Sequence, residues 1–216
     1  MGNSVIVGLT GSIAMGKSTS ADLLRQMGIP VHCSDIAARE SAKKGGAAYN
    51  EIVAAFDDLD DLRGPDGELN RQILGAFVFA NPDRKAQLEA IIHPVVQQSQ
   101  QDFIRDHSIK GADIVVLDIP LLFETGAENR LDLVICVTAP AHIQRQRIMA
   151  RDNMTAEKCD DILKSQMPDA DKQRLSDYVV STGLGIGETR LQLKDTIQNI
   201  RSRIPALRNA PHKPAP

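Results

Sequence analysis

The chain of 216 residues is poor in cysteine and has no excess of positive charge. Its three cysteines are far apart and form no Cys-x-x-Cys pair, which favours a reducing, cytoplasmic setting. A net charge of −3 provides no basic field for nucleic acid. No apolar run approaches the ~18 residues of a membrane span, and no signal segment is evident. We therefore expect a soluble protein that binds neither nucleic acid nor membrane, with no obligate protein partner evident.

Five short apolar segments predict the strands of a parallel sheet. Four are rich in β-branched residues, and the second in chain order is shorter. Near-continuous apolar runs of this kind are typical of strands buried on both faces, and helical patterns lie between them. This alternation indicates an α/β fold. The segments cover residues 4–10, 29–34, 113–119, 132–138 and 177–182.

A phosphate-binding loop is predicted directly after the first apolar segment. The stretch "GSIAMGKS" fits the spacing G-x-x-x-x-G-K-[ST] in full. Backbone N–H groups and the next helix's N-terminus hold phosphate in such loops, while Lys17 would reach the β- and γ-phosphates and Ser18 would bind Mg²⁺. Ala14 and Met15 are unexpected in a glycine-rich turn, but these positions contribute backbone N–H groups. The predicted ATP-binding residues are Gly11, Ser12, Ile13, Ala14, Met15, Gly16, Lys17, Ser18 and Thr19.

Switches, motors and kinases all use this loop. A GTPase carries an Asn-Lys-x-Asp motif that reads the base, and this sequence has none. Recombinase-like and transport ATPases are usually larger or strongly basic. The sequence therefore favours a small-molecule kinase, although a non-catalytic nucleotide-binding regulator would use the same loop.

Asp35 follows the second apolar segment, so it is expected at the carboxyl end of a strand. Ligands bind at that rim in open α/β sheets. A carboxylate there can accept a hydroxyl proton during phosphate transfer or order the Mg²⁺ shell through water. The structural alternative is an N-cap for the helix that follows. Position alone leaves both interpretations open.

Several linked motifs resemble those of the dephospho-coenzyme A kinase family, in the same order along the chain. The resemblance runs from about Val5 to Val180. It implies ATP-dependent phosphorylation of the ribose 3′-hydroxyl of dephospho-coenzyme A, the last step of coenzyme A synthesis. Beyond the phosphate loop, the most specific motifs are Leu69-Asn70-Arg71, Phe79-Ala80-Asn81, His93-Pro94 and Pro120-Leu121-Leu122-Phe123-Glu124.

The resemblance also implies roles for residues that bind the acceptor. Asp35 matches the family's proposed base. Arg71 and His93 belong to the helical part that binds the acceptor, where Arg71 can pair with a phosphate of that anionic substrate. His93 could instead be a packing histidine fixed by a turn at Pro94. Glu124 contacts either the acceptor or the hydrogen-bond frame behind it.

Asp118 lies at the end of the third apolar segment. That is the position of a Walker-B-type carboxylate, which binds Mg²⁺ through water; the alternative is a turn former at a strand end. The predicted metal-binding residues are therefore Ser18 and Asp118.

Residues 140–175 resemble the family's helical lid, which closes over ATP. Arg147 and Arg151 are an i,i+4 pair and so share one helix face. They are predicted to reach the transferring phosphoryl group, where positive charge offsets the charge of the transition state. The alternative is a solvated, ion-paired helix face, which weighs more for the neighbouring candidate Arg145 than for Arg147 and Arg151. Gln166 also matches the lid of the family.

Two positions depart from the family's pattern. The turn after the last apolar segment has Thr182 where the family typically has Asn near the adenine, so backbone groups are expected to contact the base there. Cys33 stands two residues before Asp35, where the family usually has Asp. That position is either not essential to the chemistry or compensated elsewhere.

The predicted fold class is an α/β P-loop kinase with a five-stranded parallel sheet flanked by helices, a helical acceptor-binding insertion and a helical lid. The kinase domain is expected at residues 1–205, with the insertion at 62–108. Residues 206–216, rich in Pro and Ala, are expected to form a disordered tail. ATP and Mg²⁺ are the expected cofactors, and dephospho-coenzyme A is the expected substrate. The nearest enzyme alternative is a kinase for another small acceptor, such as a nucleoside or a sugar acid.

Overall fold

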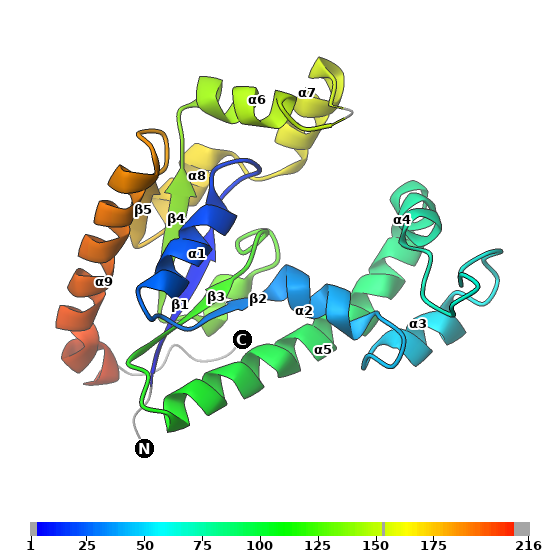
Figure 1. Ribbon diagram of the computed structural model, residues 1–216, viewed down its shortest axis with the longest axis horizontal. Helices are drawn as coiled ribbons and strands as arrows, with labels where there is room; N and C mark the ends of the chain where they lie inside the picture. The colour runs from blue at the N-terminus through cyan, green and yellow to red at the C-terminus, as the bar shows by residue number, and fades with distance from the viewer. Residues whose placement is uncertain (1–3, 153, 210–216) are drawn as a thin grey trace. The chain divides into compact units, whose positions relative to one another are not determined.

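The computed structural model (Figure 1) describes residues 4–152 and 154–209. Its central feature is a five-stranded sheet with the order β2-β3-β1-β4-β5, in which β1 pairs in parallel with both β3 and β4, and β4 with β5. Each strand lies within one of the five apolar segments, so the predicted sheet is confirmed. The strands are β1 (Val5–Thr10), β2 (Val31–Cys33), β3 (Ile114–Asp118), β4 (Leu133–Thr138) and β5 (Tyr178–Ser181).

Helices occupy most of the remaining described chain. None of those in the described residues is long and apolar enough to cross a membrane. They are α1 (Lys17–Gln26), α2 (Ser34–Ser41), α3 (Tyr49–Ala55), α4 (Arg71–Ala80), α5 (Pro82–Ile109), the 3₁₀ helix η1 (Ala127–Arg130), α6 (Ala141–Met149), α7 (Ala156–Ser165), α8 (Asp169–Leu175) and α9 (Ile186–Asn209).

The last helix extends further than the sequence indicates. α9 continues past Pro205 to Asn209, so the tail predicted at residues 206–216 begins inside a helix. Ile204 is buried in the main core and Leu207 packs against that core, which holds the final turn in place. The rest of the predicted tail, residues 210–216, lies outside those described.

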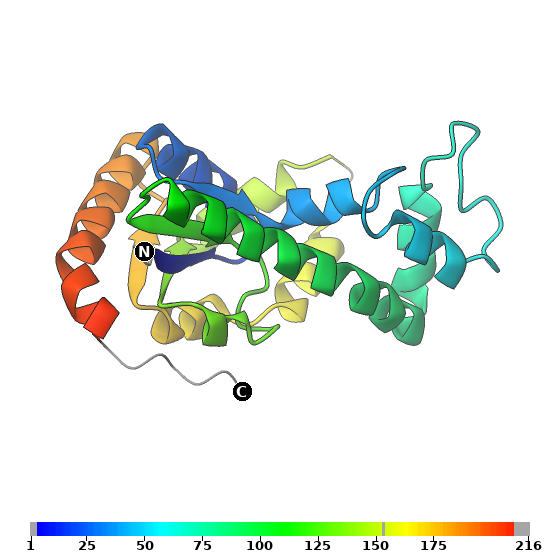
Figure 2. The same cartoon turned by 90° about the horizontal axis from the view of Figure 1, so that it is seen from below.

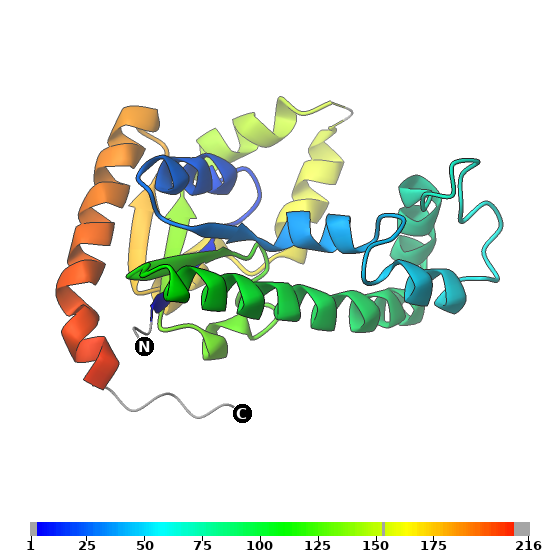
Figure 3. The same cartoon turned by 60° about the horizontal axis from the view of Figure 1, so that its bottom comes forward.

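The chain divides into two compact units. The first unit consists of the residues up to His32 and from Ile104 onward, and the second is Cys33–Phe103. The second unit begins earlier than the insertion predicted at residues 62–108, because α2 and α3 belong to it. Its own core joins α3 to α4 and the N-terminal half of α5, which lie together in Figure 3.

In the first unit, helices cover both faces of the sheet (Figure 2). Alternate residues of the central strands, such as Val7, Val116 and Ile135, form one core with α1 and α9. The opposite face is covered by α8, which contacts β4, and by the chain between β3 and β4. Burial on both faces explains why the strands are continuous apolar runs rather than alternating ones.

On this second face, the chain between β3 and β4 approaches β1 closely at Gly8. A Cβ at Gly8 would lie 2.5 Å from Leu131 Cδ1 and 2.6 Å from Leu122 Cδ1. Both leucines are buried and closely surrounded. The absence of a side chain at Gly8 therefore lets the chain that follows β3 pack directly on the sheet.

We predict that Gly8→Ala destabilises the fold by about 1–3 kcal/mol, the usual cost of overpacking a filled core. Urea unfolding of the whole protein measures this change. Gly187→Ala is the matched control, because an added Cβ in α9 meets nothing within 4 Å; it should leave the unfolding free energy within about 0.5 kcal/mol or raise it. Equal unfolding free energies for Gly8→Ala and the wild type would contradict the packing argument.

Candidate active site

The predicted phosphate loop joins β1 to α1, as its spacing requires. Two of its glycines are in positions that no other residue fills without strain: a Cβ at Gly11 would lie 2.6 Å from the carbonyl oxygen of Val137, and Gly16 has a φ of 84°. The first N–H groups of α1 have no acceptor within the helix and carry the positive end of its dipole. The loop is therefore built to hold an anion.

Ala14 and Met15, unexpected in a glycine-rich turn, each have a structural explanation. Ala14 has a φ of 60°, in the left-handed region, and so supplies the turn that a glycine would otherwise make. Met15 is almost fully buried, and its Sδ accepts from the N–H of Ala139 at 3.0 Å. The loop thus keeps its turn and gains a side chain that fixes it to the end of β4.

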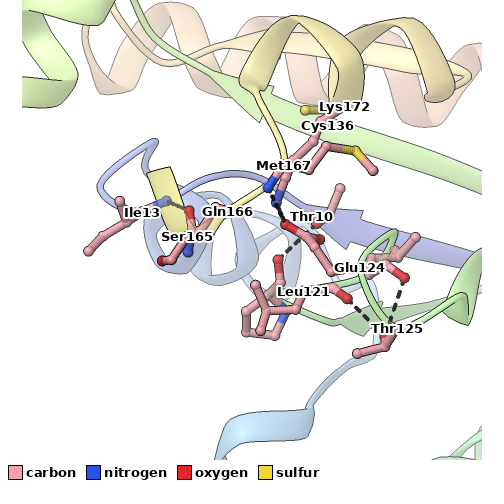
Figure 4. Close-up of polar contacts among 12 residues, drawn as sticks. Thr10, Ile13, Leu121, Glu124, Thr125, Cys136, Ser165, Gln166, Met167 and Lys172 are labelled. Carbon is pink, nitrogen blue, oxygen red and sulfur yellow. Dashed lines mark hydrogen bonds and ion pairs between the residues drawn. The ribbon is translucent and has the colours of Figure 1, made fainter. Parts of the chain in front are cut away.

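The peptide groups of Ile13 are held by two glutamines. Gln166 Oε1 accepts from the Ile13 N–H at 3.0 Å (Figure 4), and Gln144 Nε2 donates to the Ile13 carbonyl at 3.0 Å. Gln144 lies on α6, and Gln166 directly follows α7. Both sides of Ile13 are therefore tied to the predicted lid.

Lys17, the lysine of the loop, forms an ion pair with Asp118. Asp118 is buried at the end of β3, and burial at this site also lowers the pKa of His32 on the neighbouring strand, although the Asp118 charge acts in the opposite direction. Ser18 is exposed in the first turn of α1. The structure therefore brings Lys17 and Asp118 together, as the sequence alone could not show.

Ser18 and Asp118 are the side chains of this site that could contribute to binding Mg²⁺. A serine hydroxyl and a carboxylate are hard oxygen donors of the kind that Mg²⁺ prefers. Among the described residues no group of three or more His, Cys, Asp or Glu side chains could hold a metal alone. Magnesium at Ser18 and Asp118 would complete its coordination with water and with phosphate oxygens of the nucleotide.

Glu124 anchors the segment between α7 and α8 (Figure 4). Its Oε1 lies 2.7 Å from Nζ of Lys172, whose side chain is fully buried on α8, and accepts from the Met167 N–H at 3.0 Å. Burial raises the pKa of Glu124, but the hydrogen bonds from Lys172 and the backbone outweigh it, and the net shift is downward. Of the two predicted roles, these contacts are those of a hydrogen-bond frame.

The predicted lid arginines differ in their surroundings. Arg147 is partly buried, and both of its terminal nitrogens donate to protein oxygens of Ala14 and Thr182. Arg151 is exposed just past the end of α6. Arg145 pairs with Asp160 of α7 at 2.5 Å, which is the ion-paired alternative.

Three of the predicted acceptor residues lie in the second unit, whereas Glu124 lies in the first. Asp35 is exposed in the first turn of α2; Cys33 is the N-cap, so the capping interpretation of Asp35 is wrong. Arg71 begins α4 and is exposed, with Nη2 donating to the Arg39 carbonyl at 3.1 Å. His93 is exposed on α5, which continues through Pro94 without a turn. The interpretation of His93 as a packing histidine is therefore also wrong.

The model of the dephospho-CoA kinase family matches residues 5–186. The chain belongs to the dephospho-CoA kinase family. The dephospho-CoA kinase of Novosphingobium aromaticivorans is 46% identical over 93% of this chain and 96% of its own length. That of Rhodopseudomonas palustris strain HaA2 is 42% identical over 94% and 99%. The predicted family is confirmed.

Solved structures agree with this assignment. The dephospho-CoA kinase from Campylobacter jejuni superimposes with a TM-score of 0.69 at 27% identity, over 94% of this chain and 98% of that one. A crystal structure of a Thermus thermophilus protein gives a TM-score of 0.79 at 32% identity, over 92% and 98%. The predicted P-loop kinase fold is therefore confirmed.

In this member of the dephospho-CoA kinase family, sequence reasoning missed two polar residues of the site. Gln144 could have been found, because it lies three residues before Arg147 and so shares its face of α6. Lys172 could not, since it stands in a charged segment that is typical of a solvated helix, yet its side chain is fully buried. The Glu124 carboxylate beside Lys172 provides a counter-charge for the buried ammonium.

We predict that Glu124→Gln destabilises this dephospho-CoA kinase family member by ~3 kcal/mol at neutral pH. It leaves the buried Lys172 ammonium without a counter-charge, while the amide oxygen can still accept from Met167. Since the pKa of Glu124 is lowered on folding, its stabilisation is fully present above the ordinary value of 4.5 and is lost as the pH falls through the folded pKa.

Urea unfolding of the wild type and Glu124→Gln between pH 3 and 7 measures this difference. Adding Lys172→Met to Glu124→Gln is the control, because removing both charges should restore part of the stability. A difference below about 0.5 kcal/mol at pH 7, or one that does not shrink in acid, would rule out the ion pair as its cause.

Proposed function

We propose that this protein transfers the γ-phosphoryl group of ATP to the ribose 3′-hydroxyl of dephospho-coenzyme A, giving coenzyme A. The observation that carries this proposal is the family match over residues 5–186, which includes both the phosphate loop and the whole second unit. The chain also covers almost the full length of the relatives that are named for this activity.

The donor is held by the phosphate loop. Backbone N–H groups of residues 11–19 and the N-terminus of α1 bind the phosphates, and Lys17 reaches the β- and γ-phosphates. Because Lys17 is paired with Asp118, binding of ATP exchanges one anionic partner for another. The ion pair thus holds the ammonium beside the end of β3 before the nucleotide arrives.

Magnesium is proposed to be held by Ser18 and, through water, by Asp118. When bound, it offsets negative charge on the β- and γ-phosphates. Asp118 has a further role there, because it also orients Lys17. Its buried position beside the Lys17 ammonium suits that role.

The acceptor is proposed to be bound by the second unit. Asp35 accepts the proton of the 3′-hydroxyl as that oxygen attacks the γ-phosphorus; the bond to the β–γ bridging oxygen breaks and ADP leaves. Arg71 pairs with a phosphate of the substrate, and His93 contributes a second exposed polar group. Glu124 supports the site from its frame with Lys172, and Arg151 is the exposed lid arginine offered to the transferring group.

The decisive test is a coupled assay of ADP release with dephospho-coenzyme A. We expect release to depend on that acceptor and to be at least about 100-fold faster than with nucleosides or sugar acids, because a site built for a substrate's polar groups rejects analogues that lack them. Preference for another alcohol would indicate a different acceptor. ATP binding without acceptor-dependent ADP release would indicate a regulator instead.

We predict that Asp35→Asn lowers kcat by about 10²–10⁴-fold, the usual contribution of general-base catalysis. Asp35 is exposed, so the variant should fold normally. Asp83→Asn is the matched control, because Asp83 is another exposed carboxylate in the first turn of a helix of the same unit. Full activity in folded Asp35→Asn would end the assignment of Asp35 as the base.

A further inference from the structure

The guanidinium of Arg147 joins three segments of the first unit. Nη1 donates to the Ala14 carbonyl at 3.3 Å and to Thr182 Oγ1 at 3.0 Å, and Nη2 donates to the Thr182 carbonyl at 2.8 Å. Arg147 comes from α6, Ala14 from the phosphate loop, and Thr182 from the residue after β5. A planar group with several N–H donors in fixed directions suits this set of acceptors.

Thr182 extends the same network to the next peptide of the loop. Its Oγ1 donates to the Met15 carbonyl at 2.8 Å while it accepts from Arg147, and its N–H donates to the Thr138 carbonyl at 2.7 Å. Its side chain also lies over Gly16, where an added Cβ would be 3.0 Å from Oγ1. Thr182 is 6% exposed, so these bonds are shielded from water.

These hydrogen bonds stabilise the part of the loop whose backbone conformation its own residues do not favour. The left-handed region is unfavourable for a non-glycine residue, and Ala14 has a φ of 60°. Each peptide is planar, with its C=O and N–H pointing in opposite directions. Fixing the Met15 carbonyl on Thr182 therefore points the Gly16 N–H away from Thr182, and fixes its direction for a phosphate.

We propose that Arg147 is a positioning residue that fixes the phosphate loop through Ala14 and Thr182, and that it does not contact the transferring phosphoryl group. This differs from the catalytic role that the sequence predicts for it. The positioning role of Arg147 rests on the proposed function only because it requires that residues 11–19 bind a nucleotide. Thr182, where the family's adenine turn is altered, acts as its partner in this role.

The two roles predict different responses to a lysine. Lysine carries the same charge, so a phosphate contact would be largely retained in Arg147→Lys. Lysine has no planar fork, so it cannot serve the Ala14 carbonyl and both oxygens of Thr182 together. If Arg147 is a positioning residue, Arg147→Lys should therefore weaken ADP binding as much as Arg147→Ala does.

Calorimetric titration of the whole protein with ADP, together with kcat and KM for ATP, tests the proposal. We expect about 10-fold weaker ADP binding in Arg147→Ala, Arg147→Lys and Thr182→Val, a similar rise in KM, and a kcat within about 5-fold of the wild type. The double variant Arg147→Ala, Thr182→Val should bind ADP no more than about 2-fold more weakly than the weaker single one, because both changes remove one shared network.

Arg145→Ala is the matched control, since Arg145 lies on the same helix but pairs with Asp160. Its ADP affinity should stay within about 2-fold of the wild type. Melting temperatures establish which variants are folded. If Arg147→Ala is not folded, the ADP affinities of Arg147→Lys and Thr182→Val decide the test.

Three results would overturn the proposal: wild-type ADP affinity in Arg147→Lys, an equal loss in Arg145→Ala, or unchanged ADP affinity in Arg147→Ala with kcat reduced more than 100-fold. The outcome is separable from that of the proposed function, because ADP binding needs no acceptor. A wild type that binds ADP but does not phosphorylate dephospho-coenzyme A would contradict only the proposed function.

Discussion

The turn from β1 to α1 must hold a backbone conformation that its own residues do not favour. Gly16 takes positive φ without cost, but Ala14 does so against the preference of an L-residue. The surrounding structure offsets that cost with hydrogen bonds to both carbonyls of the turn and with the buried side chain of Met15. Segments far apart in the chain are thereby required to meet at this loop.

Buried cations are a second consequence of building a phosphate site. Lys17 and Lys172 both lie where water is scarce, and each has one carboxylate beside it, Asp118 and Glu124 respectively. An unpaired ammonium there would be strongly unfavourable. The second pair also fixes the chain before α8, and through it Gln166, which returns to the loop at the Ile13 N–H.

The residues proposed for the donor and for the acceptor are divided between the two units. The phosphate loop and the lid arginines belong to the first unit, whereas Asp35, Arg71 and His93 belong to the second. In phosphoryl transfer the protein contributes mainly by positioning the two substrates and by stabilising negative charge, rather than by forming covalent bonds. The proposed division of the two substrates between the two units is consistent with that requirement.

The sequence by itself determined the sheet, because continuous apolar runs are buried on both faces, and it determined the phosphate loop, because glycine spacing and Lys17 are local requirements. Only the tertiary structure decided which polar side chains work together. Lys172 was indistinguishable from a surface lysine until Glu124 was placed beside it, and nothing in the sequence indicated that Arg147 donates to Thr182. Those partners come from distant segments, and charge or spacing along a chain carries no information on such pairings.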